Sequence, residues 1–224
     1  MRIILTHEQA DFDALASLLA AHLLEESSLP VLPARLNRNL RAFLTLYGAE
    51  LPFVDARDLK LAPGERLEHV TLVDTQSLVT LKGMGKKTTV SVVDHHERRA
   101  DLPAEWAFSA DRVGACTTLL VERLREVFGS GGTLLSAIQA TLLLLGVYED
   151  TGSLTYASTT PRDALAAAYL LEHGANLKVA AQFLNPPLST EQRQACDRLL
   201  AVAEHHTIHG QNIVVACATL PEMT

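Results

Sequence analysis

The chain has 224 residues, of which 48% are hydrophobic and 20% charged, and this composition excludes a disordered or fibrous protein. The formal net charge of -7 argues against a broad basic surface that holds long nucleic acids by neutralising phosphates. The 3 cysteines include no CxxC pair, so neither a disulfide framework nor a thiolate zinc site is indicated, and a cytoplasmic location is expected. The most apolar run, residues 137–147, is too short to cross a bilayer, and no membrane role is expected.

The first half of the chain alternates short apolar runs with helical patterns. Three runs are predicted to be buried strands: Arg2–Leu5, Val70–Val73 and Thr88–Val93. Three amphipathic patterns are predicted to be helices: Ala14–Glu25, Asn39–Tyr47 and Cys116–Phe128. This alternation predicts an α/β fold with a parallel sheet flanked by helices. In such sheets ligands bind outside the carboxyl ends of the strands, where polar residues gather in this sequence.

The sequence after Asp150 is mainly helical. Helices are predicted for Pro161–His173, Leu177–Phe183 and Thr190–His206, and a strand for Gln211–Ala218. Because a single strand does not fold alone, we expect the chain to be part of a longer protein. The expected organisation is a domain over residues 1–188, a linker helix over 189–207 and the start of a second domain over 208–224.

Candidate metal ligands occur at four places, almost all at the ends of predicted strands or helices. They are His7, Asp11 and Asp13 in THEQADFD, Asp74 in LVDT, Asp94, His95 and His96 in VVDHH, and Asp150 in YEDTG. Carboxylates suit hard divalent cations, and added imidazoles shift the preference towards Mn²⁺ or Fe²⁺. Any one aspartate could be a helix cap or a turn residue, but the coincidence of the four groups favours a metal centre. Two ions about 3.5–4 Å apart could hold a phosphoryl group and convert a bridging water into a hydroxide nucleophile.

Taken in order, these four motifs resemble those of the DHH phosphoesterase superfamily. That superfamily includes RecJ-type exonucleases, oligoribonucleases, cyclic-dinucleotide phosphodiesterases and manganese-dependent pyrophosphatases. The motifs extend from residue 1 to about residue 155. The segments LNRNLRAFLTLYG and VGACTTLLVE, and the residues around EDTG, look more closely like the DHH module that some bacteria fuse to CBS domains and a poly(A) polymerase or CCA-adding nucleotidyltransferase. In the larger family a second, DHHA1-type domain holds the substrate, and from the resemblance we expect that domain to be essentially missing from residues 1–224.

The resemblance implies a role for each motif residue. Two Mn²⁺ ions, with Mg²⁺ or Co²⁺ as alternatives, would share six ligands: His7 and Asp11 on one ion, Asp13 and His95 on the other, and Asp74 and Asp150 on both. His96 would face the substrate phosphate as a hydrogen-bond donor or general acid. Asp94 would orient this catalytic loop without binding metal.

Three further residues are expected to contact the substrate. Arg38 lies in a basic, amide-rich segment where guanidinium groups could hold a phosphate, although a solvated helix face is the alternative. Arg112 and Gly114 begin a predicted helix whose N-terminal amides could bind an anion, with a tight packing turn as the alternative.

The favoured function is a manganese-dependent phosphodiesterase that uses a metal-bridged hydroxide. Its substrate would be a nucleotide, either a short oligonucleotide attacked by an exonuclease or a cyclic dinucleotide. Hydrolysis of pyrophosphate or polyphosphate is the first alternative, and it is disfavoured by the few lysines near the motifs. The second alternative is a module of a larger nucleotidyltransferase-like protein that senses a nucleotide without hydrolysing it.

Overall fold

The computed structural model describes residues 1–78, 83–129 and 135–219. The chain divides into two compact units, Met1–Leu184 and Asn185–Thr224, and each is described by itself. None of the helices in the described ranges combines the length and the hydrophobicity needed to cross a bilayer.

A parallel sheet of 6 strands forms the first unit's framework, which confirms the predicted fold class. The strands are β1 (Arg2–Leu5), β2 (Ser28–Leu32), β3 (Val54–Asp55), β4 (His69–Val73), β5 (Thr89–Asp94) and β6 (Ala107–Ala110). Their spatial order is β3-β2-β1-β4-β5-β6, and all neighbours pair in parallel. The strands β1, β4 and β5 were predicted to within one residue at each end, whereas β2, β3 and β6 were not predicted.

The strand order reverses between β1 and β4, and this reversal gives the sheet two different faces. Because parallel crossovers are right-handed, connections made before and after the reversal lie on opposite faces. One face carries α1 (Phe12–Leu24), α2 (Arg38–Tyr47) with the short helix η1 (Gly48–Glu50), and α3 (Cys116–Phe128). The other face is covered by three linkers whose described residues form no helix: 56–68, 74–88 and 95–106. Apolar residues of these linkers pack on that face. The prediction of flanking helices therefore holds for one face of the sheet.

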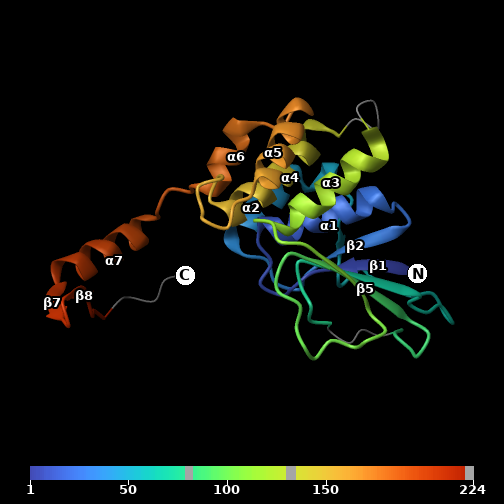
Figure 1. Cartoon of the computed structure of the whole chain (residues 1–224), viewed down its shortest axis with the longest axis horizontal. Helices are drawn as coiled ribbons and strands as arrows, with labels where there is room; N and C mark the ends of the chain where they lie inside the picture. Colours follow the sequence, from blue (N-terminus) through green and yellow to red (C-terminus); the bar gives the residue numbers. More distant parts are fainter. Residues whose placement is uncertain (79–82, 130–134, 220–224) are drawn as a thin grey trace. The chain divides into compact units, whose positions relative to one another are not determined.

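A second layer of helices packs on α1 and α3. It consists of α4 (Ala137–Thr151), α5 (Pro161–Glu172) and α6 (Leu177–Leu184), which gather on the same side of the sheet as α1 and α3 (Figure 1). The helix α4 is apolar on all sides because it lies inside this assembly, with Leu142 to Leu145 fully buried. Close approach of α4 to α1 needs the glycine at position 146. A Cβ there would lie 2.6 Å from the Cβ of Ala16 and 2.5 Å from Oγ1 of Thr117.

The second unit contains α7 (Thr190–Ala201) and an antiparallel hairpin of β7 (Glu204–Ile208) and β8 (Gln211–Val215). The prediction that the linker helix continues to residue 206 or 207 is therefore wrong. His209 and Gly210 have positive φ angles of 50° and 79°, which suit a tight hairpin turn, and the preceding residues pair with β8. The predicted strand at Gln211–Ala218 is confirmed as far as Val215, and residues 220–224 lie outside the described ranges.

Replacing Gly146 with alanine tests the close crossing of α1 and α4. Overpacking a core lowers the stability by about 1–3 kcal/mol, whereas replacing glycine by alanine within a helix raises it by about 1 kcal/mol through the higher helix propensity of alanine. We therefore expect Gly146→Ala to lower the free energy of unfolding by about 1 kcal/mol in urea denaturation. The matched control is Gly85→Ala, since a Cβ at Gly85 meets nothing within 4 Å. A stability of Gly146→Ala equal to or above that of the wild type would contradict this packing.

Candidate metal centre

All four predicted motifs meet at the carboxyl ends of β1, β4 and β5. His7 follows β1, Asp74 follows β4, and Asp94 is the last residue of β5, directly before His95 and His96. The N-cap of α1 is Asp11, and Asp13 is in its first turn. Asp150 is near the end of α4. The motifs therefore surround the point at which the strand order reverses, where α/β sheets of this kind bind ligands.

The imidazole of His95 lies among three carboxylates. Its Nε2 atom is 3.4 Å from Oδ2 of Asp150, 3.6 Å from Oδ1 of Asp74 and 3.9 Å from Oδ2 of Asp13. On the other side of Asp74, Oδ2 lies 3.4 Å from Nε2 of His7. A side chain of Asp74 with one oxygen towards each histidine is in the position expected of a bridging ligand.

Ligand atoms form three groups in which all atoms lie within 4.8 Å of one another. One group is His7, Asp11 and Asp74, and a second is Asp13, His95 and Asp150; the third is Asp74, Asp94, His95 and His96. The first two groups separate the histidines in the same way as the two predicted ligand sets. The carboxylates and imidazoles suit Mn²⁺, Fe²⁺ or Co²⁺ better than a purely carboxylate site would.

Two buried atoms at the centre of the cluster lack a hydrogen-bond partner within the described ranges: Oδ1 of Asp74 and Nε2 of His95. A buried polar atom without a partner costs free energy, so these two atoms are best explained as ligands of a cation. Burial and neighbouring carboxylates also raise the pKa of Asp13 and of Asp74 above the ordinary range. Although burial opposes it, the surrounding Asp150, Asp13 and Asp74 raise the pKa of His95 to about 9. The residues fit divalent cations because such ions would supply the positive charge that the cluster needs.

The carboxylate of Asp13 is fixed by the N-terminus of α3. Its Oδ2 accepts a hydrogen bond from the amide of Cys116 at 2.7 Å, and its Oδ1 accepts one from Thr117 at 2.8 Å. The positive end of the helix dipole stabilises this fully buried side chain. The anion that the start of α3 binds is therefore a carboxylate of the protein itself.

Hydrogen bonds also orient both histidines of the DHH motif. The Nδ1 atom of His95 lies 3.2 Å from the carbonyl oxygen of Val113, which leaves Nε2 as the lone-pair nitrogen for a metal. For His96, Nδ1 lies 2.8 Å from Oδ1 of Asp94, whose Oδ2 accepts a bond from Gln76 at 2.8 Å. Burial opposes ionisation of Asp94, but the bonds from His96 and Gln76 hold its pKa below the ordinary value. Both oxygens of Asp94 are thus engaged in orienting neighbours.

Backbone conformation places the two expected bridging carboxylates. Asp74 has a φ of 54°, in the left-handed region that aspartate and asparagine adopt more readily than most residues. Gly152 closes α4 with a φ of 55°, and a Cβ there would lie 2.3 Å from the ring of Tyr156. A negative charge near the C-terminus of a helix, such as that of Asp150, is unfavourable against the helix dipole and favours a positive partner. In the structure, Asp150 lies beside His95.

The three predicted substrate residues have different positions. Arg112 lines a cavity together with His95 and His96. Arg38 is exposed in the first turn of α2 and does not line this cavity. The prediction that Gly114 offers its amide to a substrate is wrong, because that N–H donates to both oxygens of Asp163 at 2.9 and 3.1 Å. A Cβ at Gly114 would lie 2.6 Å from Thr151, so the glycine is needed for packing.

Two polar residues near the centre were missed in the sequence. Gln76 donates to Asp94 and accepts a bond from the amide of Arg99 at 2.8 Å, and so it joins the loops after β4 and β5. Glu149 accepts a hydrogen bond from the amide of Phe12, and burial raises the pKa of Glu149 to about 7. The available signal was that Gln76 lies two residues after Asp74 and Glu149 directly precedes Asp150, but many ordinary loop and helix residues lie as close to a motif.

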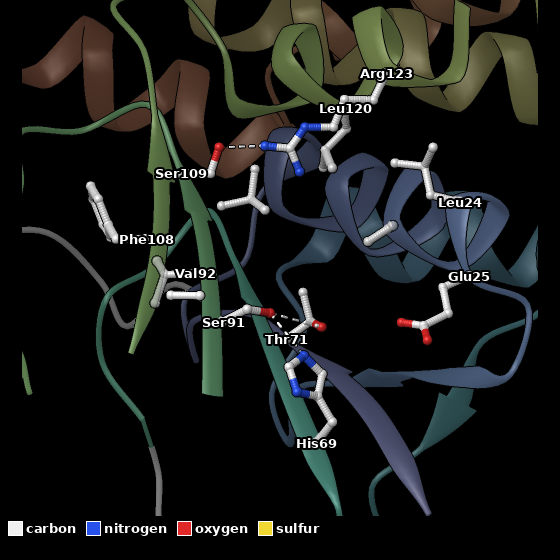
Figure 2. A pocket seen from close by; sticks show the side chains of 13 residues that line it. Leu24, Glu25, His69, Thr71, Ser91, Val92, Phe108, Ser109, Leu120 and Arg123 are labelled. Carbon is white, nitrogen blue, oxygen red and sulfur yellow. Dashed lines mark hydrogen bonds between the residues drawn. The ribbon is translucent and has the colours of Figure 1, made fainter. Parts of the chain in front are cut away.

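Two open cavities adjoin the cluster and share His96 and Glu97. The first, of about 510 Å³, lies over His7, Asp11, Asp74 and Asp150. The second, of about 550 Å³, contains Arg112 and both histidines of the DHH motif. A third cavity of about 270 Å³ lies between the sheet and the helices α1 and α3, where His69, Ser91 and Thr71 form a hydrogen-bonded row (Figure 2). It includes none of the candidate metal ligands.

Comparison with known proteins gives relatives of two kinds. An A-adding tRNA nucleotidyltransferase of Geobacter sulfurreducens is 36% identical over 98% of this chain, and one of Aquifex aeolicus is 39% identical over 68%. The chain spans only 25% and 18% of their respective lengths. Among solved structures, a protein of Methanococcus jannaschii described as a family II inorganic pyrophosphatase has a TM-score of 0.64 and 20% sequence identity. The match covers 96% of this chain and 70% of that protein. An exopolyphosphatase-related protein of Bacteroides fragilis has a TM-score of 0.65 and 18% sequence identity, and the match covers 90% of this chain and 61% of that protein.

Both solved structures share the fold of this chain. Residues 2–147 match the N-terminal domain of the DHH family. The predicted resemblance, including the relationship to nucleotidyltransferases, is confirmed by these matches. With more than half of its residues in that match and its four motifs gathered at one sheet edge, the chain belongs to the DHH family.

Proposed function

We propose that the chain is a metal-dependent phosphoesterase that hydrolyses a phosphodiester in a nucleotide substrate. The observation that carries this proposal is the position of Asp74 between two ligand groups, with one oxygen near His7 and the other near His95. Membership of the DHH family and the fold shared with a pyrophosphatase and an exopolyphosphatase-related protein support hydrolysis of a phosphate ester or anhydride.

Two divalent ions would be held by the six residues of the two groups, with Asp74 close to both His7 and His95 and Asp150 close to His95. We propose Mn²⁺ as the ion because histidine and aspartate are mixed in each group. When bound, such ions supply Lewis acidity and activate water near neutral pH. The carboxylates and the largely buried imidazole of His95 would determine where that chemistry takes place.

The side chain of His96 has a different position from that of His95. It is 61% exposed, and its Nδ1 atom is held by Asp94. The Nε2 atom therefore remains for a substrate oxygen, to which it would donate a hydrogen bond or a proton as the leaving group departs. Gln76 and Asp94 are positioning residues in this scheme.

A second candidate function is a nucleotide-binding module within a tRNA nucleotidyltransferase. The relatives of Geobacter sulfurreducens and Aquifex aeolicus, which carry that name and are much longer than this chain, favour it. In such a protein the metal centre would bind a nucleotide without turnover. We propose further domains in the same polypeptide, with the hairpin β7–β8 at the start of one of them. Hydrolysis of pyrophosphate is a third possibility, which the same assays would detect.

Substituting Asp74 with asparagine removes one negative charge from between the two ligand groups. Asparagine also adopts the left-handed conformation found at this position, so the fold should be retained. We expect Mn²⁺-dependent hydrolysis of bis-p-nitrophenyl phosphate and of a short RNA to fall at least about 100-fold, because even groups that only orient ligands contribute about 10–100-fold. Asp58→Asn, an exposed change of the same charge, is the control. Full activity of Asp74→Asn would eliminate the proposed centre.

His96→Ala separates metal binding from turnover. Since His96 is held by Asp94 rather than by the two main ligand groups, we expect bound metal, measured by atomic absorption, to stay at the wild-type level. Hydrolysis should fall by about 10²–10⁴-fold, the usual contribution of an acid or base. Loss of the metal from this variant would show that His96 is a ligand.

Gln76→Ala tests the positioning of His96 through Asp94. This change leaves an oxygen of the buried Asp94 and the amide of Arg99 without their partner. We expect kcat to fall about 10-fold at unchanged metal content, with a small change in KM and an altered pH profile of kcat. Gln182→Ala, on an exposed face of α6, is the control. A wild-type kcat and pH profile would refute the positioning role.

A further inference from the structure

The cavity on the far side of His96 from the main carboxylate cluster has features that phosphate hydrolysis alone does not require. It measures about 550 Å³ and is lined by His95, His96, Arg98, Phe108 and Arg112, together with Glu97, Ala110 and Asp111. His96 also lines the cavity over the metal ligands. A substrate with its phosphate at the centre could therefore extend past His96 into this space, whose volume is within the roughly 300–1,000 Å³ typical of small-molecule sites.

An aromatic ring forms one side of this cavity. In β6, Ser109 faces the helices and accepts a hydrogen bond from Arg123, and Phe108 projects from the opposite side of the strand (Figure 2). Successive side chains of a strand point to opposite faces of the sheet. The ring of Phe108 therefore lies on the face of the sheet on which the loop after β5 runs. There the guanidinium carbon of Arg98 lies 5.2 Å from the centre of the ring. The ring is half-buried, which leaves part of it for contact with a ligand.

The two arginines of the cavity differ from their neighbours in their ionic partners. Arg99 pairs with Asp101, and Arg162 pairs with Asp111 and Glu122. Across residues 1–78, 83–129 and 135–219, neither Arg98 nor Arg112 forms an ion pair with a carboxylate. Both side chains are exposed. In a chain with a net charge of -7, two such guanidinium groups beside His96 make a local site for an anion.

We propose that this cavity binds the nucleoside portion of a nucleotide, with the base against the Phe108–Arg98 pair and a phosphate beside Arg112. Aromatic rings and guanidinium planes are the side-chain surfaces on which unpaired bases stack. Pyrophosphate would need only the cavity over the metal ligands and would make no use of the exposed part of Phe108. This inference rests on the proposed function for the reaction and adds to it the binding site of the nucleoside, whose base would lie beyond His96 as seen from the metal ligands.

The test compares the binding of AMP and of inorganic phosphate to the Mn²⁺-loaded chain by isothermal titration calorimetry. We expect AMP to bind at least about 10-fold more tightly than phosphate. Phe108→Leu and Arg98→Ala should each lower the affinity for AMP by about 5- to 100-fold, the range measured for loss of a stacked base. Phe53→Leu and Arg125→Ala, outside the cavity, are the matched controls. Phe108 also packs on the core, so its substitution could lower the stability of the fold. Arg98 is on the surface, and its substitution should leave the stability unchanged.

Equal affinities for AMP and phosphate in the wild-type chain would overturn the inference, and so would AMP binding that neither variant alters. Hydrolysis of a dinucleotide is measured on the same proteins so that the two proposals can fail separately. AMP binding that depends on Phe108 and Arg98 without any hydrolysis would contradict the proposed function alone. Hydrolysis with unchanged AMP affinity in both variants would contradict the nucleoside site alone.

Discussion

The buried carboxylate of Asp13 is the constraint on which the candidate centre depends. Its side chain is fully buried, and a charge in that position would destabilise the fold by several kcal/mol without compensation. The amides of Cys116 and Thr117 at the start of α3 provide the compensation. This contact joins residues 103 and 104 positions apart in the sequence, and it fixes the first turn of α1 against α3. The carboxylate that results lies 3.9 Å from His95 and belongs to the same group of ligand atoms as His95 and Asp150.

The reversal of strand order provides the second condition for the site. Connections made before it carry helices, and the described residues of those made after it form no helix, so the cluster receives residues from both kinds of segment. The loop after β1 supplies His7, and the loops after β4 and β5 supply Asp74, His95 and His96. Loops without helices need other support. Gln76 gives it by bonding to Asp94, to the carbonyl oxygen of Glu97 and to the amide of Arg99.

Much of this arrangement can be predicted from the sequence because His7, Asp74 and Asp94 each come at or after the end of an apolar run that predicts a buried strand. The strands β2, β3 and β6 were missed for separate reasons. Pro30 interrupts the signal in β2, β3 has only 2 residues, and β6 is mostly exposed. The assignment of Gly114 failed because its partner, Asp163, is 49 positions away and becomes its neighbour only in the fold. Residues 204–206 continue a helical pattern locally, but pairing with β8 prevails.

The central claim is that two cations share the carboxylate of Asp74. Titration of the chain with Mn²⁺, followed by calorimetry and by electron paramagnetic resonance, tests this most directly. The structure predicts two ions per chain and a spectrum of exchange-coupled Mn²⁺, because ions bridged by carboxylates would lie about 3.5–4 Å apart. A single bound ion, two magnetically independent ions or no binding would contradict the shared centre.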